Sequence, residues 1–368
     1  MIVTAEQNYL ALDQWLIGKK KVFLVCDSSL PFLKELYEKI NGLETPTVRF
    51  SEFSPNPLYE SVVDAVALLR QEECDSIIAI GGGSAMDVAK CVKLFSGLPG
   101  DGKDGSFLKA KVFNTGIPFL AIPTTAGTGS EATRYAVLYY KGEKQSIADD
   151  SLIPETVLMD PGVLESLPAY QKKATMLDAL CHAIEAFWSI NSTEKSRGYS
   201  RQAIEMIMRH NREYLSNVRE SNREMLLAAH IAGKAINITQ TTAGHAMCYK
   251  ITSLFNCAHG HAAALCDRVL FPWMIQNTGR CIDRRGETYL RKVLDEIGEA
   301  LGGRNAEEGA QIFNEFFGSL ELPIPLASEA QFDVLKNSVN PTRLKNHPVN
   351  LDLETIDMLY HQILKPTP

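Results

Sequence analysis

Residues 76–90 of the chain read SIIAIGGGSAMDVAK. An apolar run comes first, a glycine triplet and a serine follow, and the remaining residues mix apolar and polar types in a helical pattern. Glycines let the backbone approach a ligand closely, and the N–H groups at a helix start attract phosphate. The stretch therefore predicts a strand, a phosphate-binding turn and a helix. The expected phosphate-binding residues are Gly81, Gly82, Gly83 and Ser84.

The glycine triplet has a second interpretation, because glycines also turn a strand into a helix where no ligand binds. It is not the GxGxxG fingerprint of the Rossmann fold. A second small-residue loop, residues 123–131 (PTTAGTGSE), follows another apolar run and can offer hydroxyls and N–H groups to the same ligand. The expected ligand-binding residues of this loop are Thr124, Thr125, Thr128 and Ser130.

Asp27 comes directly after a further apolar run, residues 21–26 (KVFLVC). A carboxylate at that position can accept hydrogen bonds from an adenosine ribose, which would favour NAD over NADP by repelling a 2′-phosphate. The alternative is a turn or N-cap residue ahead of Ser28 and Ser29.

The pattern of short strands and helices extends outward from the glycine loop. Residues 21–26, 47–50, 76–80 and 119–122 are buried-type strands separated by amphipathic stretches, which indicates βαβ units and a parallel sheet. Beyond residue 162 strand signals almost vanish. Helical periods take their place at residues 172–189, 196–214, 222–236, 290–301, 306–320 and 353–364.

The expected architecture is therefore an α/β dinucleotide-binding domain with a parallel sheet at residues 1–162, followed by an all-helical, metal-binding domain at residues 163–368.

A metal constellation is suggested by DALCHAIE, where Asp178 and His182 lie four residues apart and project from one helix face. His245 and His259 follow later in the chain. One carboxylate with three imidazoles suits Fe(II) or Zn(II) better than calcium or magnesium. A single histidine on a helix is more often a core or surface residue than a ligand, so the clustering carries this prediction.

Composition excludes other classes of function. The chain has 368 residues, 45% of them hydrophobic, and a formal charge of −7, which argues against a nucleic-acid-binding surface. The first twenty residues lack the pattern of a signal peptide, and no apolar stretch reaches the roughly 20 residues that cross a bilayer. A cytoplasmic enzyme without membrane partners is expected. The eight cysteines include no CxxC pair.

The motifs GGGSAMDVAK, PTTAGTGSEAT, VLMDP and DALCHAIEA, together with residues 245–260, resemble the iron-containing (group III) alcohol dehydrogenases along nearly the whole chain. The resemblance implies a dehydroquinate synthase-like fold, Fe(II) with Zn(II) as the alternative, and NAD(H) with NADP(H) as the alternative. It implies metal ligation by Asp178, His182, His245 and His259. The cofactor-binding residues in full are Asp27, Gly81, Gly82, Gly83, Ser84, Asp87, Thr124, Thr125, Thr128, Ser130 and Lys144. A homodimer or higher homo-oligomer is also expected.

Two positions depart from the family pattern. Met176 stands where a glycine is usual, and Tyr249 stands where the family commonly has a further histidine that is thought to take part in proton delivery. Tyr249 and His261 are our candidates for that role.

Within the family, residues 232–255, the HGHAAAL that follows and NPTRLKNHPVNL look similar to the subgroup that reduces phosphonoacetaldehyde to 2-hydroxyethylphosphonate. A phosphonate needs cations, preferably an arginine fork. Arg134, Arg343 and Lys345 are the candidates, with solvated surface charge as the alternative for each.

The expected reaction is metal-dependent reduction of a small aldehyde, with hydride supplied by the nicotinamide. One alternative substrate class is an uncharged aldehyde of the lactaldehyde, propanediol or butanol type. Two further alternatives are a metal-dependent hydrolase or lyase without redox chemistry, and an inactive binding protein.

Overall fold

The computed structural model describes residues 2–4, 9–111 and 113–367. The chain forms two compact units. The first unit contains residues 1–167 and 217–230, and the second contains residues 168–216 and 231–368. Residues 217–230, which belong to the expected helical domain, thus group with the first unit.

The first unit is built on a six-stranded sheet in which every neighbouring pair is parallel. In spatial order the strands are β1 (Ile2–Thr4), β8 (Thr156–Met159), β5 (Phe119–Pro123), β4 (Ser76–Gly81), β2 (Val22–Cys26) and β3 (Thr47–Phe50). The α/β class and the four predicted strands are confirmed. All residues of β2, β4, β5 and β8 are buried, as a sheet covered on both faces requires.

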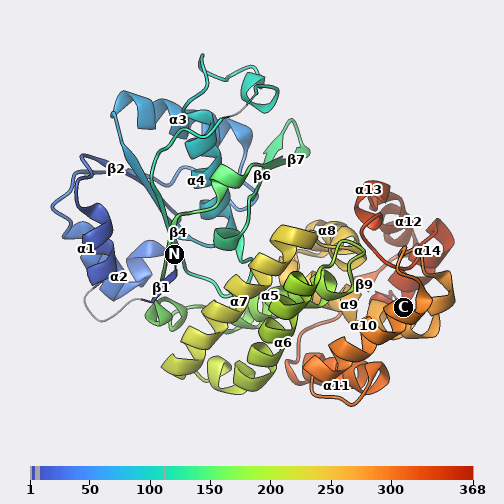
Figure 1. Cartoon of the computed structure of the whole chain (residues 1–368). Helices are drawn as coiled ribbons and strands as arrows, with labels where there is room; N and C mark the ends of the chain where they lie inside the picture. The colour runs from blue at the N-terminus through green and yellow to red at the C-terminus, as the bar shows by residue number, and fades with distance from the viewer. Residues whose placement is uncertain (1, 5–8, 112, 368) are drawn as a thin grey trace. The chain divides into compact units, whose positions relative to one another are not determined.

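The helices of this unit are α1 (Leu10–Leu16), α2 (Lys34–Asn41), α3 (Tyr59–Gln71) and α4 (Gly83–Phe95). Helix α4 packs on β4, on α3 and on β6 (Tyr135–Tyr140), and β6 pairs with β7 (Glu143–Ala148) in an antiparallel hairpin (Figure 1). The sequence analysis did not foresee this hairpin, and it missed β1 and β8. Both missed sheet strands are only three or four residues long, too short for a period to emerge.

The order of the strands determines where a ligand can bind. From β2 the chain moves to β3 on one side, and then returns to β4 on the other side of β2. In open parallel sheets, ligands bind beyond the carboxyl ends of the strands at such a reversal. Asp27 directly follows β2, and the glycine triplet begins with the last residue of β4. Both therefore lie at the carboxyl ends of the two strands where the strand order reverses.

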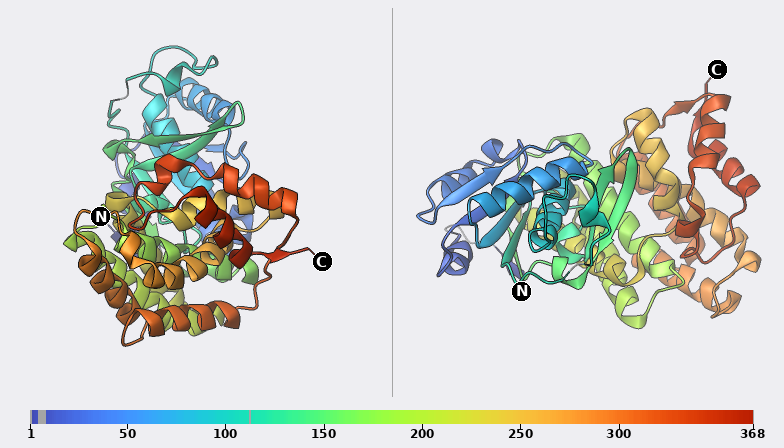
Figure 2. Two further views of the ribbon diagram at one scale, coloured as in Figure 1. Left: turned by 90° about the vertical axis from the view of Figure 1, so that its right-hand side faces the viewer. Right: turned by 90° about the horizontal axis from the view of Figure 1, so that it is seen from above.

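The second unit is helical, and this class is confirmed. Figures 1 and 2 show helices throughout, apart from the two-residue strands β9 (Leu326–Ala327) and β10 (Lys365–Pro366). Its helices are α5 (Ala169–Trp188), α6 (Glu194–Leu215), α8 (Ala243–Phe255), α9 (His259–Gln276), α10 (Glu287–Ala300), α11 (Ala306–Ser319), α12 (Glu329–Ser338), α13 (Pro341–Leu344) and α14 (Leu353–Ile363), with the C-terminal part of α7 (Arg219–Thr239).

Helices α8 and α9 were not predicted. Most residues of α9 are buried, and a helix buried on nearly all sides shows no amphipathic period. None of the helices in the described part of the chain has the length and apolar character that crossing a membrane requires.

A buried lysine connects α4 to the loop after β5. Lys90 is fully buried, and its Nζ donates hydrogen bonds to the carbonyl oxygens of Ser130 (2.6 Å), Thr133 (2.8 Å) and Tyr135 (2.7 Å). Burial lowers the pKa of Lys90 to about 8, although Asp87 and Glu131 oppose the shift. These three bonds hold the second small-residue loop against the helix that follows the first.

We expect Lys90→Met to destabilise the protein by about 3 kcal/mol or more, because three buried carbonyl groups would lose their donor. Lys93→Met is the matched control. Lys93 is also buried on α4, but its nearest carboxylate, Glu155, is half exposed and 3.9 Å away, so we expect a loss of about 1 kcal/mol or less. Urea unfolding measures both, and equal losses would contradict the role given to Lys90.

Candidate metal centre and cofactor site

The glycine loop of the first unit has a backbone that requires glycine. Gly81 has φ of +152°, and a Cβ atom there would lie 2.6 Å from Cβ of Ala85 and 2.8 Å from Oδ2 of Asp27. The loop therefore runs directly beside Asp27. Oδ1 of Asp27 accepts hydrogen bonds from Ser29, so the turn interpretation holds for that oxygen, while Oδ2 faces the loop.

The two small-residue loops lie against each other. Cβ atoms built at Gly82 and Gly83 would lie 3.4 Å from Oγ1 of Thr125 and 3.1 Å from Cγ2 of Thr128. Gly82 is the N-cap of α4 and has no side chain to bond the free N–H groups of the first turn. A cradle of N–H groups and hydroxyls at a helix start suits a pyrophosphate.

The other expected cofactor residues gather behind this cradle. The backbone N–H of Thr124 donates to the carbonyl of Gly81 (3.0 Å), and Oγ of Ser130 donates to Oδ1 of Asp87 (3.2 Å). Burial raises the pKa of Asp87 to about 6, although the charges of Lys90 and Lys144 oppose the shift. Asp87 and Lys144 are thus near each other, while Ser84 lies half-buried in the first turn of α4.

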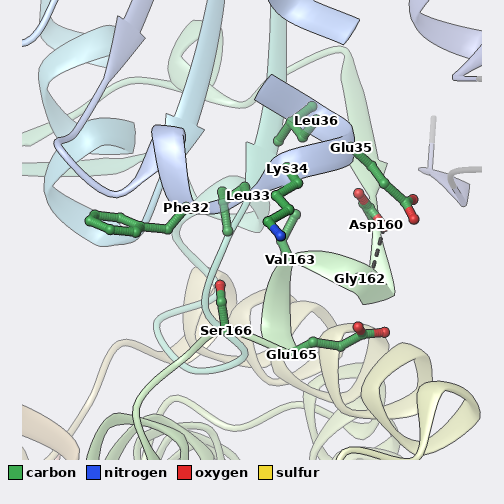
Figure 3. A pocket seen from close by; sticks show the side chains of 10 residues that line it. All are labelled: Phe32, Leu33, Lys34, Glu35, Leu36, Asp160, Gly162, Val163, Glu165 and Ser166. Atoms are coloured by element: carbon green, nitrogen blue, oxygen red, sulfur yellow. Dashed lines mark hydrogen bonds between the residues drawn. The ribbon is translucent and has the colours of Figure 1, made fainter. Parts of the chain in front are cut away.

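A surface hollow of about 430 Å³ adjoins this edge of the sheet (Figure 3). One wall is the segment that follows Asp27, including Phe32 and Leu33, and the other is the segment that follows β8, including Val163 and Ser166. Charged side chains, among them Lys34 and Glu35, line the hollow together with these residues.

The four expected metal ligands lie together in the second unit. Asp178 and His182 are one turn apart on α5, His245 is the third residue of α8, and His259 is the first residue of α9. Ligand atoms of Asp178, His245 and His259 all lie within 4.8 Å of one another. Nε2 of His182 is 3.9 Å from Oδ1 of Asp178, and its ring stacks on His245 with centroids 4.5 Å apart.

A glycine allows this convergence. Gly260 follows His259, and a Cβ atom there would lie 2.1 Å from the carbonyl oxygen of Ala174 and 2.5 Å from Cβ of Asp178. The first turn of α9 can therefore contact α5 only because residue 260 has no side chain. This contact brings His259 to Asp178.

The residues fit a divalent metal ion. Oδ1 of Asp178 and Nε2 of His245 are both buried, lie 3.5 Å apart, and have no hydrogen-bond partner within the described ranges. Burial alone would raise the pKa of Asp178, yet His182, His245 and His259 bring it well below its ordinary value. A charged, buried carboxylate facing imidazole nitrogens is what an Fe(II) or Zn(II) site offers before the ion is bound.

Sequence reasoning missed one residue beside this cluster. Glu185 is fully buried, and its carboxylate accepts hydrogen bonds from His245 and Thr242. The signal was present in DALCHAIEA, because Glu185 follows Asp178 by seven residues and His182 by three, which is again the same helix face.

Tyr249 and Arg343 lie next to the metal ligands. The Tyr249 ring stacks on the His259 ring with centroids 5.5 Å apart. Nη1 of Arg343, on α13, donates to the Tyr249 hydroxyl (3.0 Å), and its guanidinium carbon is 4.9 Å from the ring centroid. A half-buried cation thus reaches the edge of the metal cluster within the same unit.

The remaining candidates have other surroundings. His261 is fully buried between Tyr170, whose hydroxyl is 3.2 Å from Nδ1, and the ring of Phe317, and burial lowers its pKa to about 4. Arg134 belongs to the first unit and pairs at 3.4 Å with the exposed Asp150, and Lys345 is exposed. These contacts favour Tyr249 over His261 for proton delivery and Arg343 over Arg134 and Lys345 for an anion.

Comparisons with known proteins agree with this geometry. Residues 2–161 match the sequence profile of iron-containing alcohol dehydrogenases, and residues 172–363 match the C-terminal profile of the Fe-containing alcohol dehydrogenase family. Phosphonoacetaldehyde reductase of Streptomyces viridochromogenes is 30% identical over 340 residues, covering 89% of this chain and 85% of that protein. NADPH-dependent butanol dehydrogenase of Clostridium saccharobutylicum is 35% identical over 298 residues, covering 79% and 72%.

Among solved structures, sulfoacetaldehyde reductase from Bifidobacterium kashiwanohense in complex with NAD+ has a TM-score of 0.88 at 24% identity, covering 99% of this chain and 97% of that one. At this level of identity the likeness describes the fold.

Gly81→Ala should weaken NADH binding by about tenfold or more, because its φ of +152° and the close contacts would displace the loop at a cost of about 1–3 kcal/mol. Gly116→Ala is the control, since Gly116 also has positive φ but no heavy atom within 4 Å of the new Cβ. NADH fluorescence titration of both variants measures the effect. An unchanged affinity in Gly81→Ala would remove this loop from the cofactor site.

Proposed function

This chain is a member of the iron-containing alcohol dehydrogenase family, and we propose that it reduces a small aldehyde bearing a phosphonate group to the corresponding alcohol. Phosphonoacetaldehyde is the proposed substrate and 2-hydroxyethylphosphonate the product. The observation that carries this choice is the guanidinium of Arg343, which lies beside Tyr249 at the edge of the metal ligands.

We propose that the metal ion is held by Asp178, His182, His245 and His259, with Fe(II) favoured by the family and Zn(II) as the alternative. When bound, the ion would supply Lewis acidity at the carbonyl oxygen, and the dihydronicotinamide would supply the hydride. The four side chains would hold the ion, and the burial of Asp178, His182 and His245 limits the access of water to their ligand atoms.

In the first unit, the N–H groups at the start of α4 and the hydroxyls of Thr125 and Thr128 would bind the pyrophosphate. Oδ2 of Asp27, beside the glycine loop, supports a ribose contact and a preference for NAD over NADP. The hollow beside Phe32 would accept the adenine ring. Each half of the site therefore lies within one unit and can be tested by itself.

Several features support a phosphonate. Arg343 is half-buried, and within the described part of the chain its guanidinium pairs with no carboxylate. A guanidinium binds a tetrahedral oxyanion through parallel N–H bonds. The relative from Streptomyces, whose name gives phosphonoacetaldehyde as its substrate, aligns over 89% of this chain. The hydroxyl of Tyr249, between Arg343 and His259, would donate the proton that completes the alcohol.

An uncharged aldehyde is the second candidate, favoured by the 35% identity to a butanol dehydrogenase. That relative is NADPH-dependent, so NADP(H) stays the alternative cofactor. A cytoplasmic location and a homo-oligomeric assembly remain predictions from the sequence.

His259→Ala should remove bound metal and turnover while leaving NADH binding unchanged, because His259 belongs to the second unit and the cofactor loops to the first. Metal content by mass spectrometry and NADH fluorescence titration give the two readouts. His361→Ala is the control, since His361 stacks on Phe332 outside the cluster. Full metal content in His259→Ala would contradict the proposed ligation.

Arg343→Met should lower kcat/KM for phosphonoacetaldehyde by about 10- to 100-fold, since a charge-assisted hydrogen bond contributes about 1.5–3 kcal/mol. For butanal we expect little change. Lys345→Met, two residues on and exposed, should leave both substrates unaffected. Steady-state kinetics with the two aldehydes measure both values of kcat/KM. An equal loss of kcat/KM for both would leave the uncharged aldehyde as the better proposal.

A further inference from the structure

Glu185 lies on the same face of α5 as two proposed metal ligands. It follows Asp178 by two helical turns, and its side chain is fully buried. A buried carboxylate is costly unless its charge and its lone pairs are compensated, so its surroundings require an explanation.

Four donors surround this carboxylate. Oε2 accepts hydrogen bonds from the backbone N–H and the hydroxyl of Thr242, the latter at 2.6 Å. Oε1 accepts from the backbone N–H of His245 at 3.0 Å and contacts Nδ1 of the same residue. Thr242 is the N-cap of α8 and His245 its third residue, so Glu185 also caps that helix.

An ionised carboxylate has a lone pair for each of these four groups. Each oxygen receives one backbone N–H, and a backbone N–H can only donate. An amide in place of the carboxylate would direct its own N–H donors at one of these fixed donors.

The consequence falls on the imidazole of His245. If Glu185 is ionised, it can only accept, and Nδ1 of His245 then carries the proton that it donates to Oε1. The other ring nitrogen, Nε2, is then the atom available as a ligand. It is buried, lacks a hydrogen bond within the described residues, and lies 3.5 Å from Oδ1 of Asp178.

We propose that Glu185 is a positioning residue that fixes His245 with Nδ1 protonated and Nε2 directed at the metal position. A carboxylate on the far nitrogen orients a ligating imidazole and strengthens it as a donor. The inference rests on the metal centre of the proposed function and adds a residue to it.

A neighbouring carboxyl group provides a matched control. Oδ1 of Asp267 would lie 1.9 Å, and Oε1 of Glu185 2.8 Å, from a Cβ atom at Gly244, so both carboxyls approach the same glycine. Asp267 is also fully buried. Burial and the charge of Glu185 raise its pKa well above the ordinary value. Asn has nearly the same shape as Asp, so Asp267→Asn leaves the space beside Gly244 filled.

The experiment measures the Zn(II) affinity of three metal-free proteins. These are the original protein, its Glu185→Gln variant and its Asp267→Asn variant. We expect Zn(II) to bind Glu185→Gln about 10- to 100-fold more weakly, and Asp267→Asn within about twofold of the original. NADH binding reports that the variants are folded. A Glu185→Gln variant that binds both NADH and Zn(II) as tightly as the original chain overturns the inference. Absence of Zn(II) binding by the original chain would instead overturn the metal centre itself.

A second measurement needs no variant at position 185, so it stands even if Glu185→Gln does not fold. In Zn(II)-loaded protein with ¹⁵N-labelled histidine, NMR distinguishes protonated from metal-bound ring nitrogens. The His245 signals are assigned by their loss in His245→Gln. We expect Nδ1 to carry a proton and Nε2 to bind the metal, and the reverse assignment contradicts the role of Glu185.

Discussion

The close approach of α9 to α5 is the constraint on which the metal centre depends. Gly260 has no side chain, so the first turn of α9 can contact the backbone of α5 at Ala174 and place His259 beside Asp178. A single methyl group at position 260 would overlap backbone and Cβ atoms that have no freedom to move. The imidazoles of His182, His245 and His259 compensate the charge of the buried Asp178.

Much of the fold was accessible from the sequence because the relevant signals are local. The run from Ser76 to Gly81 is apolar throughout, and the helical half shows clear periods. The elements that were missed lack such signals. Strand β8 has four residues, and α9 is buried on almost every side, so neither carries a period that distinguishes a strand from a helix.

In the candidate site too, some residues could be predicted from local sequence signals and others could not. Asp178 and His182 can be paired from their spacing on one helix, whereas His245 and His259 join them only through tertiary packing. Nothing local distinguished Arg343 from Arg134, yet one lies beside Tyr249 and the other pairs with an exposed carboxylate. Glu185 was visible in a quoted motif, but its four donors come from a distant segment.

The position of Arg343 on the short helix α13 has a bearing on how such proteins diverge. The proposed metal ligands lie on the long, closely packed helices α5, α8 and α9. Arg343 lies on α13, a helix of four residues that are half-buried or exposed. If Arg343 binds the substrate as proposed, a mutation in α13 would change substrate recognition while the proposed metal ligands keep their positions. A substrate-binding residue on a separate short helix would let relatives with the specificities that their names give, for butanol and for phosphonoacetaldehyde, use one fold.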